Sequence, residues 1–551
     1  MMKCKRILAG LASFMLVLSP ISVYAEEATV VAQSEDGTQT YSDCASAWSA
    51  AKSGTPIVMV QDWITDSRFS LDEGQSATIY MSGHKIDTNL NGGSVYDGEV
   101  FYLDKNASLN LIGSTTNTTF KFNGYGYNGS SDSTTVSLTS GGLVTGGSSK
   151  NGAGAIHMKE GSTLNLENVA VGGNSSAAEI ASNGGAINMN NDNCVVNMTN
   201  SIIAYNKANY GGGIYVAGEN EVIEMKSSSI FGNYASENGG GICSNKDATY
   251  VHMSENSSIN ANYAKKSGGG IYFDNPYCQV TSTDTLAEIS SNISAKANGG
   301  GGGGIYFPDS NRGNTAQVVG ITFKLNQAES YGGAIYTDEN DITIDNCQFY
   351  ENQAYRGGAI YNLGKRNTIS NCTMEENKAE YEGGAIYDGN EDTKLENCTI
   401  RKNEAGSEGG GVFVPRTKDI TLFGTMIITN NKRSDGASDD LFLEKTWATT
   451  AYVKGEISSD SSVGIRTGAS GTTQIGTDIT SDCSKRFFLN DTGIYYIEYK
   501  DHKLYKSSSS PLSSSIFGNS NLGIAVVVMA GIIVVGVVCL GVHKKKNREE
   551  A

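Results

Sequence analysis

The sequence has little proline, histidine and tryptophan, and its positive charge is outweighed by negative charge. The 551 residues include 6 Pro, 5 His and 3 Trp, and 58 acidic residues exceed 41 basic ones, for a net charge of −17. Glycine is abundant, with 67 residues, but no Gly-x-y triplet persists, which excludes a collagen-like chain. An acidic body repels polyanions, so we expect no nucleic-acid partner. We expect no cofactor either; calcium is the one ion that such a surface would attract.

The chain also lacks a sustained 3.6-residue hydrophobic pattern, which argues against helical repeats. What recurs instead is a short box, seen most clearly as Gly332-Gly333-Ala334-Ile335-Tyr336. Its copies are spaced by about 25 to 34 residues, and a unit of this length that repeats many times is typical of a solenoid. Each unit predicts three short strands between turns, and so one coil of a parallel β-helix. Aligned on the aliphatic residue, the boxes lie at Ile156, Ile187, Ile214, Ile242, Ile271, Ile305, Ile335, Ile360, Ile386 and Val412.

A second column of the repeat is asparagine, three residues after an apolar residue in each unit. Stacked asparagines can donate and accept hydrogen bonds along the rod and tolerate left-handed backbone, so we predict a structural ladder. A row of ligand-binding amides is the less favoured interpretation. The column comprises Asn174, Asn206, Asn233, Asn262, Asn292, Asn326, Asn352, Asn377, Asn403 and Asn430.

Three cysteines, Cys347, Cys372 and Cys398, share one position, 12 residues after the box aliphatic residue. Other units fill this position with Val169, Ser201, Ser228, Ile321 or Thr425, so it faces inward. We predict a buried stack of reduced thiols and no metal site, because Cys-x-x-Cys spacing is absent. Neighbouring coils lie about 4.8 Å apart, which leaves a disulfide within the stack open.

The residue after the box aliphatic residue is aromatic in most units. Strand alternation places it on the outer face, and His157 and Asn188 at the same position favour exposure. Stacking between coils explains such a stripe without any function. The sharper hypothesis is a platform for sugar rings or a protein partner. The stripe comprises Tyr215, Tyr272, Tyr306, Tyr336, Tyr361, Tyr387 and Phe413.

Gly-Gly-Ala-Ile boxes paired with Phe-x-x-Asn, as in Phe349 to Asn352, resemble the repeats of the polymorphic outer-membrane protein family. The resemblance implies an all-β, right-handed parallel β-helix of the pectin-lyase-like kind, displayed at a cell surface and adhesin-like. Members of that family carry a C-terminal translocator barrel, from which this chain departs. It has instead one apolar stretch with a basic tail, and no Leu-Pro-x-Thr-Gly sorting motif.

The two ends predict the compartment. Residues 1–25 resemble a secretory signal peptide, and residues 522–542 are long and apolar enough for one membrane-spanning helix. The basic residues that follow place the C-terminus in the cytoplasm and the body outside, on what we expect to be a bacterial cell surface. The predicted segments are a signal peptide (1–25), a flexible N-terminus (26–43), an N-terminal cap with a helix at 45–52 and first coils (44–149), regular repeats (150–431), closing coils or a small β cap (432–506), a Ser-rich linker (507–521), the transmembrane helix (522–542) and a cytoplasmic basic tail (543–551).

The favoured function is therefore a membrane-anchored, extracellular, adhesin-like protein that binds a glycan or a surface protein of a host or neighbouring cell. Because parallel β-helices also carry enzymes, a polysaccharide lyase or glycoside hydrolase is the alternative. A passive structural rod is the third. No catalytic or metal-binding set of residues stands out in the repeats, so we lean against an enzyme.

Overall fold

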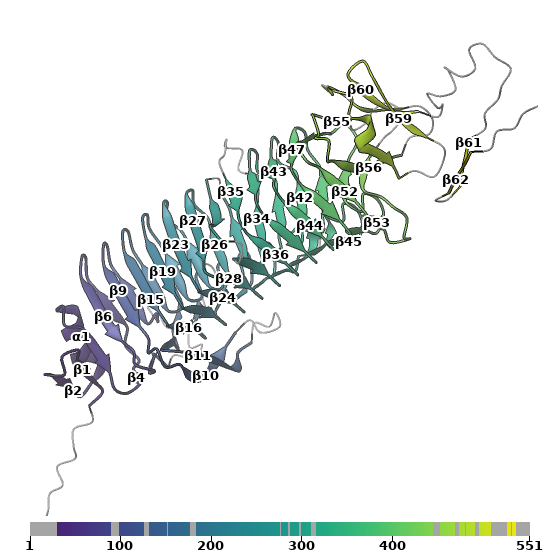
Figure 1. Ribbon diagram of the computed structural model, residues 1–551. Coiled ribbons are helices and arrows are strands. Elements are labelled where there is room, and N and C mark those ends of the chain that lie inside the picture. The colour runs from purple at the N-terminus through teal and green to yellow at the C-terminus, as the bar shows by residue number, and fades with distance from the viewer. Residues whose placement is uncertain are drawn as a thin grey trace, which may run out of the picture.

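The chain winds into a long rod of stacked coils (Figure 1). The computed structural model describes residues 30–89, 98–125, 132–150, 152–176, 183–275, 277–284, 287–296, 299–309, 316–444, 452–468, 473–479, 481–490, 495–507, 526–529 and 532–535.

Most coils contribute one strand to each of four ladders, which run along the rod. Ladder 1 carries the box residues and pairs in parallel and in register, as in Ile335 opposite Ile360. Its strands are β5 (Phe69–Leu71), β8 (Phe101–Leu103), β14 (Ile156–Met158), β18 (Ile187–Met189), β22 (Ile214–Val216), β26 (Ile242–Ser244), β30 (Ile271–Phe273), β34 (Ile305–Phe307), β38 (Ile335–Thr337), β42 (Ile360–Asn362), β46 (Ile386–Asp388), β50 (Val412–Val414) and β54 (Leu441–Leu443).

Ladder 2 follows the acidic or polar turn after each box. Its strands are β1 (Ala32–Ser34), β2 (Thr40–Tyr41), β3 (Ile57–Met59), β6 (Ser76–Tyr80), β9 (Ser108–Ile112), β15 (Thr163–Glu167), β19 (Val195–Thr199), β23 (Glu221–Lys226), β27 (Thr249–Ser254), β31 (Gln279–Ser282), β35 (Gln317–Val319), β39 (Thr343–Asp345), β43 (Thr368–Ser370), β47 (Thr393–Glu396), β51 (Asp419–Phe423), β55 (Tyr452–Lys454), β57 (Thr473–Gly476), β59 (Tyr496–Lys500) and β60 (Lys503–Ser507).

Ladder 3 precedes the asparagine column, and its last strand β56 pairs with both β52 and β54, which joins ladders 1 and 3. Its strands are β4 (Trp63–Ile64), β7 (Lys85–Asp87), β12 (Leu143–Thr145), β16 (Ala170–Gly172), β20 (Ile202–Ala204), β24 (Ser229–Phe231), β28 (Ser258–Asn260), β32 (Glu288–Ser290), β36 (Thr322–Lys324), β40 (Gln348–Tyr350), β44 (Thr373–Glu375), β48 (Thr399–Arg401), β52 (Ile427–Thr429) and β56 (Ser462–Thr467), with β58 (Phe487–Leu489) paired to β56.

Ladder 4 follows the asparagine column directly and was not separated in the three-strand prediction. The difference arises at Glu351, whose left-handed backbone (φ 54°) turns the chain between β40 and β41. Its strands are β13 (Ser148–Ser149), β17 (Ser175–Ser176), β21 (Lys207–Ala208), β25 (Tyr234–Ala235), β29 (Tyr263–Ala264), β33 (Ile293–Ser294), β37 (Gln327–Tyr331), β41 (Gln353–Arg356), β45 (Lys378–Ala379), β49 (Glu404–Ala405) and β53 (Lys432–Arg433).

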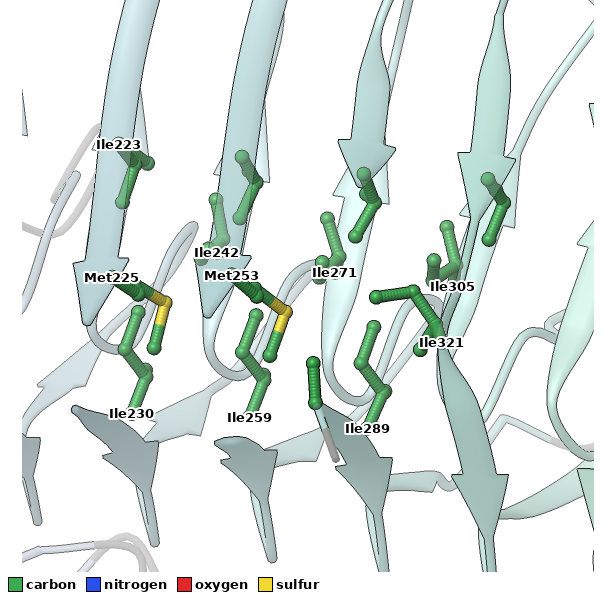
Figure 2. Packing of buried hydrophobic residues seen from close by; sticks show 14 of the residues in the cluster. Ile223, Met225, Ile230, Ile242, Met253, Ile259, Ile271, Ile289, Ile305 and Ile321 are labelled. Carbon is green, nitrogen blue, oxygen red and sulfur yellow. The ribbon is translucent and has the colours of Figure 1, made fainter. Parts of the chain in front are cut away.

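The interior is filled by apolar residues, most of them aliphatic, that three ladders send inward. Figure 2 shows how Met225 and Ile230 of one coil lie beside Met253 and Ile259 of the next. In the regular coils the box isoleucines are completely buried, as Ile335 is. Burying one such side chain contributes about 1.5–3 kcal/mol, and every coil repeats the gain. The alternation of inward aliphatic and outward polar residues therefore fixes the register of the whole rod.

The two glycines of the box have different roles. Gly332 has left-handed backbone (φ 65°), and a Cβ placed there would lie 2.2 Å from the carbonyl oxygen of Ile335. A Cβ on Gly333 would lie 2.2 Å from the carbonyl oxygen of Gly358 in the next coil. The first glycine therefore permits the turn and the second permits neighbouring coils to approach.

The N-terminal end differs from the prediction at residues 30–43, which were expected to be flexible. Strand β1 pairs antiparallel with both β2 and β3. This pairing satisfies the edge that the first coil would otherwise expose, which explains why the segment is ordered. Helix α1 (Cys44–Lys52) follows, with Asp43 accepting a hydrogen bond from the Ser46 amide at 2.7 Å. Its Trp48 ring packs 5.2 Å from Phe69 and 5.8 Å from Phe101.

Two elements depart from the parallel coils. The antiparallel hairpin of β10 (Thr118–Gly124) and β11 (Thr134–Ser140) packs Phe120 and Leu138 on the outside of ladder 3, where they form a second, small apolar cluster with Leu143. Near the other end, β57 and β59 both pair antiparallel with β60, and a short 3-10 helix, η2 (Ser484–Arg486), lies between β57 and β59 in the chain. Residues 432–506 thus contain both closing coils and a small antiparallel sheet.

Several predicted segments lie mostly or wholly outside the described residues: the signal peptide (1–25), most of the linker (507–521) and the basic tail (543–551). Within the predicted membrane helix (522–542), the described residues form two antiparallel strands, β61 (Val526–Met529) and β62 (Ile532–Val535). Runs of β-branched Val and Ile favour strands, which accounts for the difference. Among the helices formed by described residues, none has the length and apolar character to cross a membrane.

Candidate binding face along the tyrosine column

The aromatic residues that follow the box aliphatic residue form a continuous column on ladder 1. In-register pairing sets Tyr306 opposite Tyr336, Tyr336 opposite Tyr361, and Tyr361 opposite Tyr387. Their rings stack with centroid distances of 4.4, 5.5 and 4.7 Å. We call the set Tyr272, Tyr306, Tyr336, Tyr361, Tyr387, Phe413 and Phe442 the tyrosine column.

The expectation that this column is exposed is wrong for much of its length. Tyr336 is 8% exposed and Phe413 is 3% exposed, and Tyr215, Tyr361, His157 and Asn188 are also buried; Tyr272, Tyr306 and Tyr387 are half-buried. The residues do point away from the aliphatic core, but the turn before each box folds back over them.

Two contacts show how the turn covers the rings. A Cβ on Gly301 would lie 3.0 Å from the Tyr336 ring, and the Tyr331 ring stacks 4.5 Å from that of Tyr361. Burial raises the pKa of the Tyr336 and Tyr361 phenols, which therefore stay neutral. The column is thus a second packed layer outside the β-helix core.

Two exposed aromatic residues lie beside the column: Tyr355 at the end of ladder 4, in β41, and Tyr381 in the segment between β45 and β46. Tyr355 is 39% exposed and Tyr381 is 38% exposed, and their rings stack at 5.7 Å. The Arg356 guanidinium lies 5.1 Å from the Tyr381 ring centroid and 5.5 Å from that of Tyr387, and pairs with Glu382 at 3.1 Å. We call Tyr331, Tyr355, Arg356, Tyr381 and Tyr387 the aromatic patch.

Sequence reasoning missed this patch because it followed the box column alone. The signal was present: Tyr355 and Tyr381 both stand between a ladder asparagine and the next box. Exposed tyrosine and arginine side chains are enriched at the energetic centres of protein interfaces, and tyrosine faces also stack on apolar faces of ligands. The aromatic patch therefore holds the rings beside the tyrosine column that a partner can reach.

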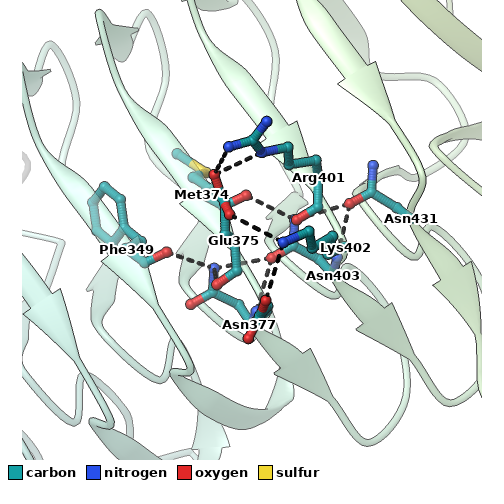
Figure 3. Close-up of polar contacts among 9 residues, drawn as sticks. Phe349, Met374, Glu375, Asn377, Arg401, Lys402, Asn403 and Asn431 are labelled. Carbon is teal, nitrogen blue, oxygen red and sulfur yellow. Dashed lines mark hydrogen bonds and ion pairs between the residues drawn. The ribbon is translucent and has the colours of Figure 1, made fainter.

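The predicted asparagine column runs along the corner between ladders 3 and 4. The Asn326 side-chain amide donates to Asn352 Oδ1 at 3.0 Å, and the Asn326 backbone N–H donates to the same oxygen at 3.0 Å. The amide also donates to the carbonyl of Ile289 at 2.8 Å, so the coils are linked in both directions. Figure 3 shows the same arrangement at Asn377, Asn403 and Asn431.

Two details of this column correct the prediction. Asn431, not Asn430, receives the hydrogen bonds of Asn403, because the chain shifts by one residue and buries Met426 where Thr425 was expected. The left-handed backbone belongs to the residue before the ladder asparagine, so Asn430 has φ 61° and is exposed. The ladder ends at Asp440, whose carboxylate accepts from the Asn431 backbone and side chain at 2.8 and 2.9 Å.

The tyrosine column also ends where the glycine box is lost. Phe442 lies 4.2 Å below the Arg466 guanidinium, which pairs with Asp439 at 2.6 Å and Glu408 at 2.5 Å. Ser438 and Asp439 thus stand at the two glycine positions of the box and Asp440 at the alanine position, and the carboxylates of Asp439 and Asp440 end both columns.

Cys347, Cys372 and Cys398 are buried and carry free thiols. The Cys372 thiol donates to the carbonyl of Ser370 at 3.0 Å, and its pKa lies well above the usual range because of burial and the neighbouring thiols. Within the described coils, no group of three or more His, Cys, Asp and Glu residues could hold a metal ion.

Comparison with known families bears on the fold. Residues 296–475 match a family model described as right handed beta helix region. The match spans the aromatic patch but covers about a third of the chain (180 of 551 residues), and its description names a fold and no activity. Comparisons with curated proteins and with solved structures give no match. The chain is thus a parallel β-helix repeat protein.

Proposed function

We propose that this protein is an adhesin-like rod that binds a glycan or a surface protein of another cell through the aromatic patch. The observation that carries the proposal is the stacked pair Tyr355 and Tyr381, each more than a third exposed, with Arg356 across both rings. The exposed part of these rings contributes little to folding stability, so a stacked pair of exposed rings favours a contact surface for a partner.

Rigidity supports the same proposal. Arg356 is held by Glu382 and by the ring of Tyr387, and the tyrosine column packs beneath the patch. A preorganised surface spends little conformational entropy on binding, which raises affinity for a given contact area.

The test is binding of the purified chain to glycan and cell-surface protein arrays, with the double variant Y355S/Y381S. We expect binding by the natural chain and at least a tenfold loss in the double variant. F423S is the matched control, because Phe423 is 43% exposed on ladder 2, away from the patch. Equal binding by Y355S/Y381S and the natural chain would refute the patch. Absence of any ligand for the natural chain would favour a passive rod.

Display outside the cell is part of the proposal, with residues 1–25 directing export and residues 522–542 anchoring the chain in the membrane. The sequence of these segments and the resemblance to polymorphic outer-membrane repeats support it. Deleting residues 522–551 should release the chain into the medium; retention in the membrane fraction would contradict the anchor.

We infer also that helix α1 closes the N-terminal end of the core through Trp48.

A further inference from the structure

Between Tyr215 and Phe442, the line of outward aromatic residues is interrupted at one coil. Cys243 occupies the position between Tyr215 and Tyr272, to both of which it is paired in register. The small thiol leaves a cavity of about 390 Å³ where the neighbouring coils hold a ring, a volume within the range of small-molecule sites. Its lining is Asn183, Tyr210, Tyr215, Asn238, Cys243, Asn245, Tyr272 and Asp274. We call this cavity the Cys243 slot.

Two tyrosines bound the slot along the rod. One face of Tyr272 is covered by Tyr306, at 5.3 Å and 7° between the ring planes, so its other face is turned toward the coil of Cys243. Tyr215 bounds the opposite side. Because Tyr215 and Tyr272 are two coils apart, roughly 10 Å separates their backbones along the rod.

This separation admits one ligand ring. In the tyrosine column a gap of the same two coils is filled by one ring, as Tyr336 fills the gap between Tyr306 and Tyr361. A pyranose ring can occupy such a gap, because the C–H groups on its two faces pack well on the electron-rich face of tyrosine.

Polar groups around the slot are arranged for hydroxyl donors. The Asn245 amide nitrogen donates to the Tyr215 hydroxyl at 2.6 Å, while Asn245 Oδ1 is buried without a hydrogen-bond partner. Asn183 Oδ1 is a second buried acceptor without a partner. Buried acceptors in this state destabilise the fold, and a ligand hydroxyl would satisfy them.

The charge of the lining narrows the ligand further. None of the residues that line the slot is basic, and Asp274, which accepts from the Tyr272 hydroxyl at 3.0 Å, contributes a carboxylate. Burial raises the pKa of the Cys243 thiol, so the floor of the slot is uncharged. An anionic sugar would meet Asp274 without a compensating cation.

We propose that the Cys243 slot binds one neutral hexopyranose unit, stacked between Tyr215 and Tyr272, with hydroxyls donating to Asn245 and Asn183. This assignment rests on the proposed binding function of the rod and narrows the partner to a carbohydrate. The slot and the aromatic patch share no residue, so they are two separate sites on the rod.

The decisive variant is C243Y, which completes the line of aromatic residues. The substitution is compatible with the fold: a Cβ on Gly239 would lie 2.5 Å from the Cys243 Cβ, and one on Gly268 would lie 2.7 Å from the Tyr272 Cβ, so the two backbones are alike and one already carries tyrosine. We expect C243Y to keep or raise the melting temperature and to weaken sugar binding at least tenfold.

Binding is measured by saturation-transfer NMR and calorimetry on the full-length chain in detergent, with glucose, galactose, mannose, glucuronic acid and phenol as probes. We expect binding of at least one neutral hexose, weaker binding of glucuronate, and at least fivefold weaker hexose binding in N245A. The patch variant Y355S/Y381S is the control and should bind the hexose as the natural chain does.

The outcomes separate the two proposals. Hexose binding that survives in C243Y, or phenol binding without hexose binding, would overturn the slot. If no monosaccharide binds but Y355S/Y381S still abolishes array binding, the slot fails and the proposed function stands. Loss of hexose binding in C243Y with unchanged array binding in Y355S/Y381S supports the slot and refutes the patch.

Discussion

Replacing Asn352 by alanine tests how strongly the asparagine ladder holds neighbouring coils together. Asn352 is completely buried and makes four side-chain hydrogen bonds. Its Oδ1 accepts from the backbone and side chain of Asn326, and its Nδ2 donates to the carbonyl of Phe323 at 3.0 Å and to Asn377 Oδ1 at 2.9 Å. N352A removes all four bonds and leaves the Asn326 backbone N–H without its acceptor.

The expected loss follows from these contacts. Each buried hydrogen bond contributes about 1 kcal/mol net, which gives a loss of about 4 kcal/mol. Two partners keep other bonds: Asn326 still donates to Ile289, and Asn377 Oδ1 still accepts from the Asn352 backbone. The Asn326 backbone N–H is therefore the group left without a partner, and we expect the loss of stability to be local to the coils on either side of Asn352.

N352D separates the acceptor from the donor. The aspartate keeps the accepting oxygen but turns a second oxygen toward the Phe323 carbonyl and Asn377 Oδ1, so at pH 7 it should cost at least as much as N352A. Protonation at pH 4 supplies an O–H donor and should recover part of the loss. An aspartate does occur at the end of the ladder, where both carboxylate oxygens of Asp440 only accept hydrogen bonds, from Asn431 and Asn490.

The assay is native-state hydrogen exchange under urea for amides of residues 326–403, with urea denaturation followed by circular dichroism. Opening free energies near Asn352 should fall by about 4 kcal/mol, whereas Q353A, at an exposed neighbour, should change stability by less than about 0.5 kcal/mol. A loss below about 1 kcal/mol in N352A, or an equal loss in Q353A, would refute the ladder as a source of stability.

Three further predictions follow. Burial raises the pKa of Glu221 to about 9, so the stability that its protonated carboxyl contributes is fully present below the unfolded pKa and is lost as pH rises. Relative to E221Q, the free energy of unfolding of the natural chain should fall by about 1.4 kcal/mol per pH unit between pH 5 and 8. Denaturation curves of the two chains with the same pH dependence would contradict this. Thiol titration without reductant should find the eight cysteines of the described residues free after unfolding, and Cys347, Cys372 and Cys398 unreactive before it; a titration in which two of these three are blocked would indicate a disulfide in the stack instead. G333A should destabilise the rod by more than G37A, because a Cβ at Gly37 meets no atom within 4 Å and only its left-handed backbone (φ 70°) is strained; equal melting temperatures would contradict the close approach of coils.

The repeat could be read from the sequence because each coil must satisfy the same local requirements. Gly332 and Gly333 are needed for a left-handed turn and a close backbone approach, and Ile335 must face the core, so all three recur as a pattern. The asparagine ladder follows the same logic, since a buried corner repeated in register requires the same donor and acceptor each time.

The candidate site was less predictable. Strand alternation correctly places Tyr336 and Ile335 on opposite faces of the strand. Whether an outward side chain is exposed to solvent depends on the turn that folds over it, and that turn varies between units. Tyr355 and Arg356 come together with Tyr381 and Tyr387 from successive coils, at distances that no single unit specifies.

The coil, its core and its asparagine corner follow from the sequence alone, because they depend on contacts between equivalent positions one repeat apart. Three features emerge only in the folded rod: which aromatic rings are buried, where the ladder shifts from Asn430 to Asn431, and the cavity that a cysteine opens between two tyrosines. Burial and cavity volume depend on side chains from several coils packed together, and these contacts are not periodic.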